Sequence, residues 1–241
     1  MWYFPRLGGP GALAKVRIHV VVDNYAERGL LSAWGLSLYV ETSNVRILFD
    51  FGPDPHILEY NSKKLGLDPK SLDFAVLSHY HVDHFGGAAY VAQEVPGLTT
   101  YVPPGPQARL VSLGLNPVVV EHSIAPAPGV FIAGPMRAGF MFYEIALLLT
   151  APAALAPVLV VGCSHPGVVK VVKLCERIAG QKLFAVVGGM HMPSLSELEY
   201  LAKRVEVIYP LHCSGLEAVE FLRSRYPSKL GEACAGTTIS L

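Results

Sequence analysis

The alternation of apolar and polar positions predicts a series of short strands and helices. In the N-terminal half, β-branched and apolar runs predict strands over residues 16–22, 35–40, 45–49, 74–77, 99–102 and 118–120. Apolar positions at helical spacing predict helices over residues 55–65, 88–95 and 107–113. Gly66 follows the first of these helices and is expected to end it.

The C-terminal half repeats the pattern of a strand followed by a helix. Strands are predicted over residues 145–150, 158–161, 183–187, 205–209 and 237–240, and helices over residues 168–178, 195–204 and 216–225. Pro166 suits the start of the first of these helices. The pairs Ser194/Glu197 and Ser214/Glu217 have the spacing of capping boxes at the start of the other two.

The apolar run over residues 145–161 is the one stretch that could be taken for a membrane span. It contains Pro152 and Pro157, and internal prolines would break a transmembrane helix. We therefore interpret the run as two buried strands joined by a turn at residues 151–157, in a protein that does not span a membrane.

Both halves combine strands with helices, and no linker separates them. The economical packing is two sheets face to face with helices outside, which is an α+β fold. We expect a single domain over residues 16–241. Residues 1–15 contain Pro5, Pro10 and several glycines, and they predict a loose N-terminal extension without a signal peptide.

Composition and charge exclude several classes of protein. Apolar residues make up 51% and charged residues 16% of the chain, which excludes intrinsic disorder. The 19 basic residues balance the 19 acidic ones, which argues against a nucleic-acid partner. The four cysteines form no C-x-x-C pair, so we expect free thiols in a reducing, cytoplasmic compartment; a single disulfide is the open alternative.

The segment SHYHVDHFGG, residues 78–87, carries the most specific chemical signal. It places His79, His81, Asp83 and His84 between a predicted strand and a predicted helix. In an extended loop His79 and His81 point to the same side, whereas Asp83 and His84 fall at the turn into the helix. One segment can therefore face two metal positions. Imidazoles with a carboxylate suit one or two Zn²⁺ ions, and Fe, Mn and Co are the alternatives.

Further ligands are expected at the ends of other strands. His165, His191 and His212 each come within four residues of a predicted strand end. Because such ends meet at one edge of a sheet, these imidazoles are candidates to complete the site. The remaining histidines occupy less distinctive positions and are not assigned to the site: His19, His56 and His122.

Asp50 at the end of the strand ILFD, followed by the histidine motif, resembles the metallo-β-lactamase superfamily. The resemblance implies a four-layer αββα sandwich of two mixed sheets with a one- or two-metal site at one edge. Shorter motifs, GPMR at 134–137, GCSH at 162–165, GGMH at 188–191 and HCSG at 212–215, are similar to one branch. That branch contains the archaeal dihydropterin–ribofuranosylaminobenzene phosphate synthase of methanopterin biosynthesis and many uncharacterised relatives.

The resemblance also implies roles for individual residues. One metal would be held by His79, His81 and His165, and the other by Asp83, His84 and His212. Asp50 would hold the ligand loop by hydrogen bonds.

One position departs from the pattern of the superfamily. Cys163 stands where most members have a bridging aspartate, so it is expected to be a thiolate ligand, a neighbouring thiol or a bystander. The second metal position is therefore less well defined by the sequence than the first. His191 is expected to donate a proton or contact substrate. The alternative is that it is a metal ligand contributed from late in the sequence.

These residues predict a metal-dependent hydrolase. Water on such a metal has a pKa of roughly 7, so a metal-activated hydroxide would attack an ester, lactam or phosphoester bond. Asp83 would orient the water, and His191 would protonate the leaving group. Arg137 is the candidate anchor for an anionic small-molecule substrate, with a solvated loop arginine as the alternative.

Other functions use the same residues. The resemblance implies a transferase that joins a dihydropterin pyrophosphate to an aryl amine phosphate, and a non-catalytic metal-binding module is the second alternative. A nuclease is disfavoured by the neutral charge. The apolar residues Phe131, Ile132, Met141 and Phe142 allow a homodimer surface, with monomer and dimer equally expected.

Overall fold

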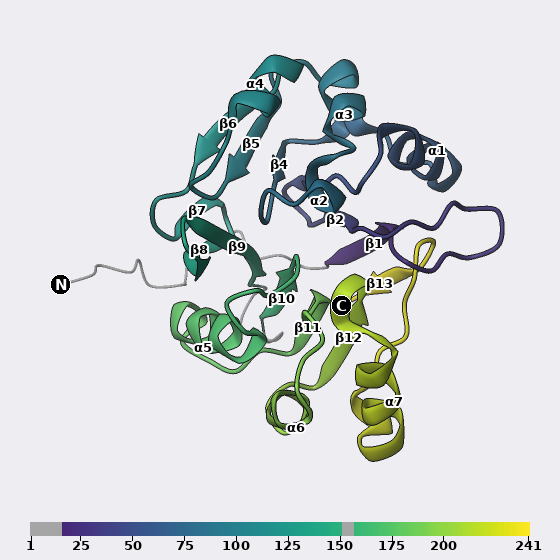
Figure 1. Ribbon diagram of the computed structural model, residues 1–241, viewed down its shortest axis with the longest axis vertical. Coiled ribbons are helices and arrows are strands. Elements are labelled where there is room, and N and C mark those ends of the chain that lie inside the picture. The colour runs from purple at the N-terminus through teal and green to yellow at the C-terminus, as the bar shows by residue number, and fades with distance from the viewer. Residues whose placement is uncertain (1–15, 151–156) are drawn as a thin grey trace.

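The computed structural model describes residues 16–150 and 157–241 (Figure 1). The N-terminal elements are β1 (Arg17–Val22), β2 (Ser37–Glu41), β3 (Arg46–Phe49), α1 (Pro55–Leu65), β4 (Phe74–Val76), α2 (Val82–Phe85), α3 (Ala88–Glu94), β5 (Thr99–Val102), α4 (Ala108–Leu113) and β6 (Asn116–Val119). The C-terminal elements are β7 (Ile124–Ala127), β8 (Val130–Gly139), β9 (Phe142–Leu149), β10 (Val158–Val161), α5 (Val168–Ala179), β11 (Ala185–Gly189), α6 (Leu195–Ala202), β12 (Val207–Leu211), α7 (Leu216–Arg225) and β13 (Thr238–Ser240).

The strands form two mixed sheets. The first has the order β13-β1-β2-β3-β4-β5-β6, and the second has the order β12-β11-β10-β9-β8-β7. In each sheet an antiparallel part, β13 to β3 or β7 to β10, continues into a parallel part. The parallel strands of each sheet therefore direct their carboxyl ends to a shared edge.

Three apolar clusters show how the layers pack. The central cluster joins side chains of both sheets, including Ile18, Phe49, Leu147 and Val160. A second packs α5, α6 and α7 on the outer face of one sheet, and a third packs α1, α3 and α4 on the outer face of the other. Figure 1 shows these helices flanking the two sheets from opposite sides. The predicted αββα sandwich of two mixed sheets is confirmed.

The strand pair expected at residues 145–150 and 158–161 is present as β9 and β10, which pair antiparallel. Along β9, Leu147 and Leu149 face the central cluster while Ala146 and Leu148 face the helices. Burial on both faces explains why the run is continuously apolar. The predicted turn at 151–157 and the predicted extension at 1–15 lie outside the described residues, apart from Pro157. None of the described helices is both long and apolar enough to cross a membrane.

Two strands, β7 and β8, were not predicted. The long strand β8 contains Gly134, Pro135 and Gly139, residues that ordinarily punctuate strands, and its pairing with β9 shifts register near these positions. Its pairing partner, rather than its own sequence, makes this segment a strand. Arg137 therefore lies exposed on β8, so the alternative of a solvated loop arginine was wrong about the loop.

Two predicted helix starts were also wrong. Ser214 does not cap α7: Gly215 occupies that position without a side-chain cap, and Ser214 Oγ instead accepts a hydrogen bond from Met190 N (3.1 Å). Helix α5 begins at Val168, after Gly167, rather than at Pro166. By contrast, the capping box of Ser194 and Glu197 at the start of α6 is confirmed.

The apolar residues that suggested a dimer surface have other partners. Ile132 is fully buried in the central cluster, Phe131 packs beneath the helices, and Phe142 stacks on His81 with ring centroids 4.9 Å apart. Only Met141 of the four is exposed. The surface proposed from these residues was wrong, whereas the oligomeric state itself stays a prediction.

Candidate metal centre

The histidine segment leaves the first sheet at the end of β4 and turns into the short helix α2. His79 and His84 are fully buried, while His81 and Asp83 lie nearer the surface. The turn separates the side chains into two groups, as the spacing predicts. Strands β10 and β12 of the second sheet bring further histidines to the same place.

The first group consists of His79, His81 and His165. Their donor atoms lie within 4.8 Å of one another, and His79 Nε2 is 3.1 Å from His81 Nδ1. The His165 ring centroid lies 4.6 Å from that of His79 and 4.9 Å from that of His81. Three imidazoles therefore face one point, which is the donor set of many catalytic zinc sites.

The second group consists of Asp83, His84 and His212, whose donor atoms also lie within 4.8 Å of one another. Asp83 Oδ2 lies 3.2 Å from His212 Nε2 and 3.8 Å from His84 Nε2. His212 Nε2 is buried and makes no hydrogen bond among the described residues, although Asp83 Oδ2 lies 3.2 Å away. A buried ring nitrogen without a partner is costly unless a cation binds it. The side chains of both groups thus fit divalent metal ions.

Asp50 orients the ligand loop from the end of β3. Its carboxylate is fully buried and accepts hydrogen bonds from Ser78 N (2.6 Å), Ser78 Oγ (2.7 Å) and His84 Nδ1 (2.7 Å). Ser78 Oγ is also 2.9 Å from His79 Nδ1. These bonds occupy the Nδ1 atoms of His79 and His84 and leave each Nε2 directed at the centre.

Glu144 performs the same task for His165, and the sequence reasoning missed it. This carboxylate of β9 is 2% exposed and accepts from the backbone N–H groups of Cys163, Ser164 and His165 (2.7–2.9 Å). It also lies 3.0 Å from His165 Nδ1. The sequence signal that could have identified it was a single acidic residue, Glu144, within the otherwise apolar run 142–149.

Asp23 and Asn24, after β1, hold His212. Asp23 Oδ1 accepts from His212 N at 2.7 Å, and Asn24 Oδ1 lies 3.1 Å from His212 Nδ1. The Asn24 amide also donates to His212 O at 2.9 Å. A segment near the N-terminus therefore fixes a candidate ligand that lies almost two hundred residues later.

The local electrostatics at His79 and Asp83 favour metal-binding protonation states. Burial and the neighbouring imidazoles lower the pKa of His79 well below its usual value, so this ring is neutral at pH 7. Burial raises the pKa of Asp83, but the His212 and His84 imidazoles outweigh it and bring the pKa to about 2. Neutral imidazole and ionised carboxylate are the forms that bind a cation.

The backbone is unusual at the same places. Asp50, Ser164, His191 and His212 all have positive φ angles, between 48° and 60°. Left-handed conformations are uncommon for residues other than glycine and collect at functional sites. Each of these residues comes within three residues of the end of a strand.

Comparison with known proteins supports the fold described above. Residues 35–145 match the family model of the metallo-beta-lactamase superfamily. The solved structure of Tm1679, a metal-dependent hydrolase of the beta-lactamase superfamily, superposes with a TM-score of 0.79 at 24% identity and covers 93% of this chain and 98% of its own. The protein has the metallo-β-lactamase fold.

Two proteins of Methanocaldococcus jannaschii are similar to this chain. The 7,8-dihydropterin-6-methyl-4-(beta-D-ribofuranosyl)-aminobenzene-5'-phosphate synthase is 26% identical, over 95% of this chain and 98% of its own. The uncharacterized protein MJ0448 is 25% identical, over 84% and 92% of the two chains. The predicted resemblance to the superfamily and to its synthase branch is confirmed. Metal ligation by the individual residues stays a prediction.

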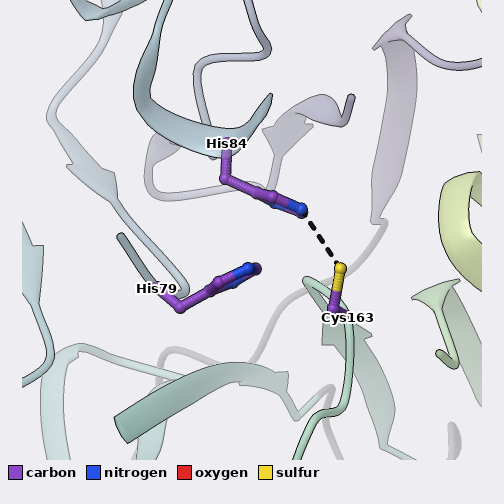
Figure 2. A group of neighbouring side chains, drawn as sticks. All are labelled: His79, His84 and Cys163. Atoms are coloured by element: carbon purple, nitrogen blue, oxygen red, sulfur yellow. Dashed lines mark hydrogen bonds between the residues drawn. The ribbon is translucent and has the colours of Figure 1, made fainter. Parts of the chain in front are cut away.

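Cys163 lies inside this metallo-β-lactamase-fold centre, at the end of β10. Its sulfur is 3.2 Å from His84 Nε2 and accepts a hydrogen bond from the Cys213 thiol at 3.1 Å. Figure 2 shows the Cys163 side chain pointing at the His84 ring, with the His79 ring alongside. Cys163 forms a candidate ligand group with His79 and His84, which favours the thiolate-ligand and neighbouring-thiol predictions over the bystander alternative.

His191 and Arg137 lie at the margin of the centre. The exposed His191 ring has its centroid 4.5 Å from that of His165, but none of the ligand groups found in the described residues includes it. Arg137 lines a groove of about 420 Å³ with Lys170, Lys173 and Arg177. Pro166, directly after His165 in the sequence, also lines this groove, whereas none of the candidate ligands does.

Glu144→Gln is expected to weaken metal binding about 10- to 100-fold, because a neutral amide orients His165 and its three backbone partners less strongly. Metal content after dialysis against graded chelator, measured by elemental analysis, checks this. Glu121→Gln, a change at an exposed acid, serves as the control. Equal metal retention by the two variants would contradict the role of Glu144.

Proposed function

We propose that this protein is a metal-dependent hydrolase that cleaves an ester, lactam or phosphoester bond of a small substrate. The observation that supports it is the convergence of eight metal-competent side chains, in four overlapping groups, at one edge of the sandwich. Zn²⁺ suits these donors best, with Fe, Mn and Co as alternatives. His79, His81 and His165 would hold one ion, and Asp83, His84 and His212 the other.

A bound ion supplies Lewis acidity, which polarises the bond under attack and acidifies water at the site. Asp83, ionised at neutral pH, would accept a hydrogen bond from the attacking water and so orient it. His191, which lies open to solvent beside His165, would pass a proton from its ring to the leaving group. Glu144 and Asp50 keep the imidazoles in position.

The basic groove of Arg137, Lys170, Lys173 and Arg177 supports an anionic substrate. No acidic residue of the described chain lines it, although the protein as a whole is neutral. A guanidinium binds carboxylate or phosphate in bidentate fashion, so Arg137 is our proposed anchor. The concentration of positive charge in this groove favours a phosphoester among the three bond types.

Four free thiols accord with a reducing compartment, and we propose a cytoplasmic location.

His81→Ala is expected to abolish turnover and to remove the metal of the first group, because only two imidazoles remain to bind it. Metal content and phosphoesterase, esterase and lactamase rates are measured on the same preparations. His122→Ala, at an exposed histidine outside the site, should keep both. A fully active, metal-free His81→Ala protein would refute the metal-dependent mechanism.

Arg137→Gln is expected to raise KM for an anionic substrate about tenfold with little change in kcat, because a charge-assisted hydrogen bond is lost away from the reacting bond. Steady-state kinetics with the best phosphoester from the panel check this. Arg109→Gln, at another exposed arginine, is the control. An unchanged KM would remove Arg137 from the substrate site.

A transferase is the second candidate, and the full-length similarity to the archaeal synthase supports it. In that reaction a dihydropterin pyrophosphate is joined to an aryl amine phosphate, and pyrophosphate leaves. The same metal site would stabilise the leaving pyrophosphate.

Supplying the dihydropterin pyrophosphate with and without the aryl amine phosphate separates the two candidates. A hydrolase is expected to release pyrophosphate at the same rate in both reactions, whereas a transferase releases it only with the amine and forms a coupled product detectable by mass spectrometry. Metal content without turnover on any substrate would favour the non-catalytic module.

A further inference from the structure

Two cysteines meet beside the candidate metal centre. Cys163 comes just after β10 and Cys213 lies in the turn after β12, so they belong to the strands on either side of β11. The Cys213 thiol donates a hydrogen bond to Cys163 Sγ, and the two sulfurs are 3.1 Å apart. Both side chains are buried, with 3% of Cys163 and 6% of Cys213 exposed. The proposed hydrolysis gives Cys213 no role.

Gly189, at the end of β11, allows the two cysteines to approach each other. An added Cβ at this position would lie 2.7 Å from Cys213 Sγ and 3.3 Å from Cys163 Cα. Any larger residue here would therefore push against both cysteines. The Cys213 sulfur also accepts a hydrogen bond from His191 N at 3.3 Å. The backbone of β11 and the turn after it thus hold the two sulfurs together.

One of the two cysteines can be reached from solvent. Cys213 lines a cavity of about 620 Å³ beside His212, whereas Cys163 does not. Trp34 and Met192, which are 63% and 75% exposed, also line this cavity, so it is open to water. A small oxidant that enters the cavity would therefore meet Cys213 first.

The other two cysteines are placed differently. Cys175 is fully buried among the apolar side chains that pack α5 against its sheet. Cys234 lines the same cavity as Cys213, and its sulfur accepts from Thr237 Oγ1 at 3.9 Å. Among the four cysteines, all in the described part of the chain, only Cys163 and Cys213 are joined by a sulfur–sulfur hydrogen bond.

We propose that Cys163 and Cys213 form a peroxide-sensitive dithiol, whose closure to a disulfide weakens metal binding at the centre. The Cys213 sulfur first attacks hydrogen peroxide: an S–O bond forms, the O–O bond breaks, and water leaves with the thiol proton. The Cys163 sulfur then attacks the oxidised sulfur: an S–S bond forms, the S–O bond breaks, and a second water leaves with the Cys163 proton. Two electrons pass from the sulfurs to the peroxide.

The geometry suits the second step. An S–S bond is about 2.0 Å long, so the two sulfurs must approach by roughly 1 Å from their present separation. A small rotation of the two side chains supplies a movement of this size. No other sulfur of the described chain lies as close to Cys213, so Cys163 is the expected partner.

The disulfide would remove a candidate metal ligand. Cys163 belongs to one candidate ligand group with His79 and His84 and to another with His212 and Cys213, and Figure 2 shows its sulfur directed at His84. A thiolate binds Zn²⁺ strongly, whereas a disulfide sulfur carries no negative charge. The effect on metal binding rests on the metal centre of the proposed function, but formation of the disulfide does not.

The first test is to treat the purified protein with hydrogen peroxide, both as isolated and after removal of metal by chelator. Non-reducing digestion and mass spectrometry should detect a peptide that joins Cys163 to Cys213, and dithiothreitol should remove it. Cys234→Ser should form the same joined peptide. Cys213→Ala and Cys213→Ser should not form it, and circular dichroism checks that each variant is folded.

The second test measures metal affinity of the oxidised protein. Oxidised and re-reduced samples are loaded with Zn²⁺ and dialysed against graded chelator. The chelator concentration that removes half of the zinc should be at least about tenfold lower for the oxidised sample, because a ligand has been lost. Peroxide should leave this concentration unchanged in Cys213→Ala, whose Cys163 has no partner, and should lower it in Cys234→Ser as in the parent.

Two results would overturn the dithiol: no joined peptide at peroxide concentrations that oxidise Cys234, or a disulfide between Cys213 and Cys234 instead. A disulfide that forms without any change in zinc retention would overturn its effect on the metal centre. Absence of turnover on every substrate would refute the proposed function alone, because neither test depends on catalysis.

Discussion

Hydrogen bonding of imidazoles to buried side-chain acceptors at strand ends is the interaction on which this centre depends. Asp50 and Glu144 are almost wholly shielded from water, so each carboxylate must be satisfied by N–H and O–H groups of the protein. The nearest donors are the backbone of the ligand segments and the Nδ1 atoms of His84 and His165. Satisfying the carboxylates therefore fixes the direction of the imidazoles, and Asn24 does the same for His212.

Close approach of the two sheets makes these contacts possible. At Gly162, an added Cβ would lie 2.1 Å from Ser78 Oγ, the same hydroxyl that bonds Asp50. A glycine at the end of β10 thus lets the second sheet reach the ligand loop of the first. The left-handed backbone at Asp50, Ser164 and His212 then turns the chain into the shared edge.

The surroundings of the centre are chemically divided although the chain carries no net charge. The groove at Arg137 gathers basic side chains, while the cavity beside His212 gathers apolar ones such as Trp34.

Local pattern was enough for the sequence to determine much of this protein: the αββα class, the capping box at Ser194, and the histidine segment with its division at the turn into α2. These features depend on neighbours within a few residues. Strand β8, the missing cap at Ser214, the support of His165 by Glu144 and the cavity beside Trp34 were decided only by the tertiary structure. In each case the deciding partner is distant in sequence. Where two sheets pack face to face, polar groups that are shielded from water have few hydrogen-bond partners within reach.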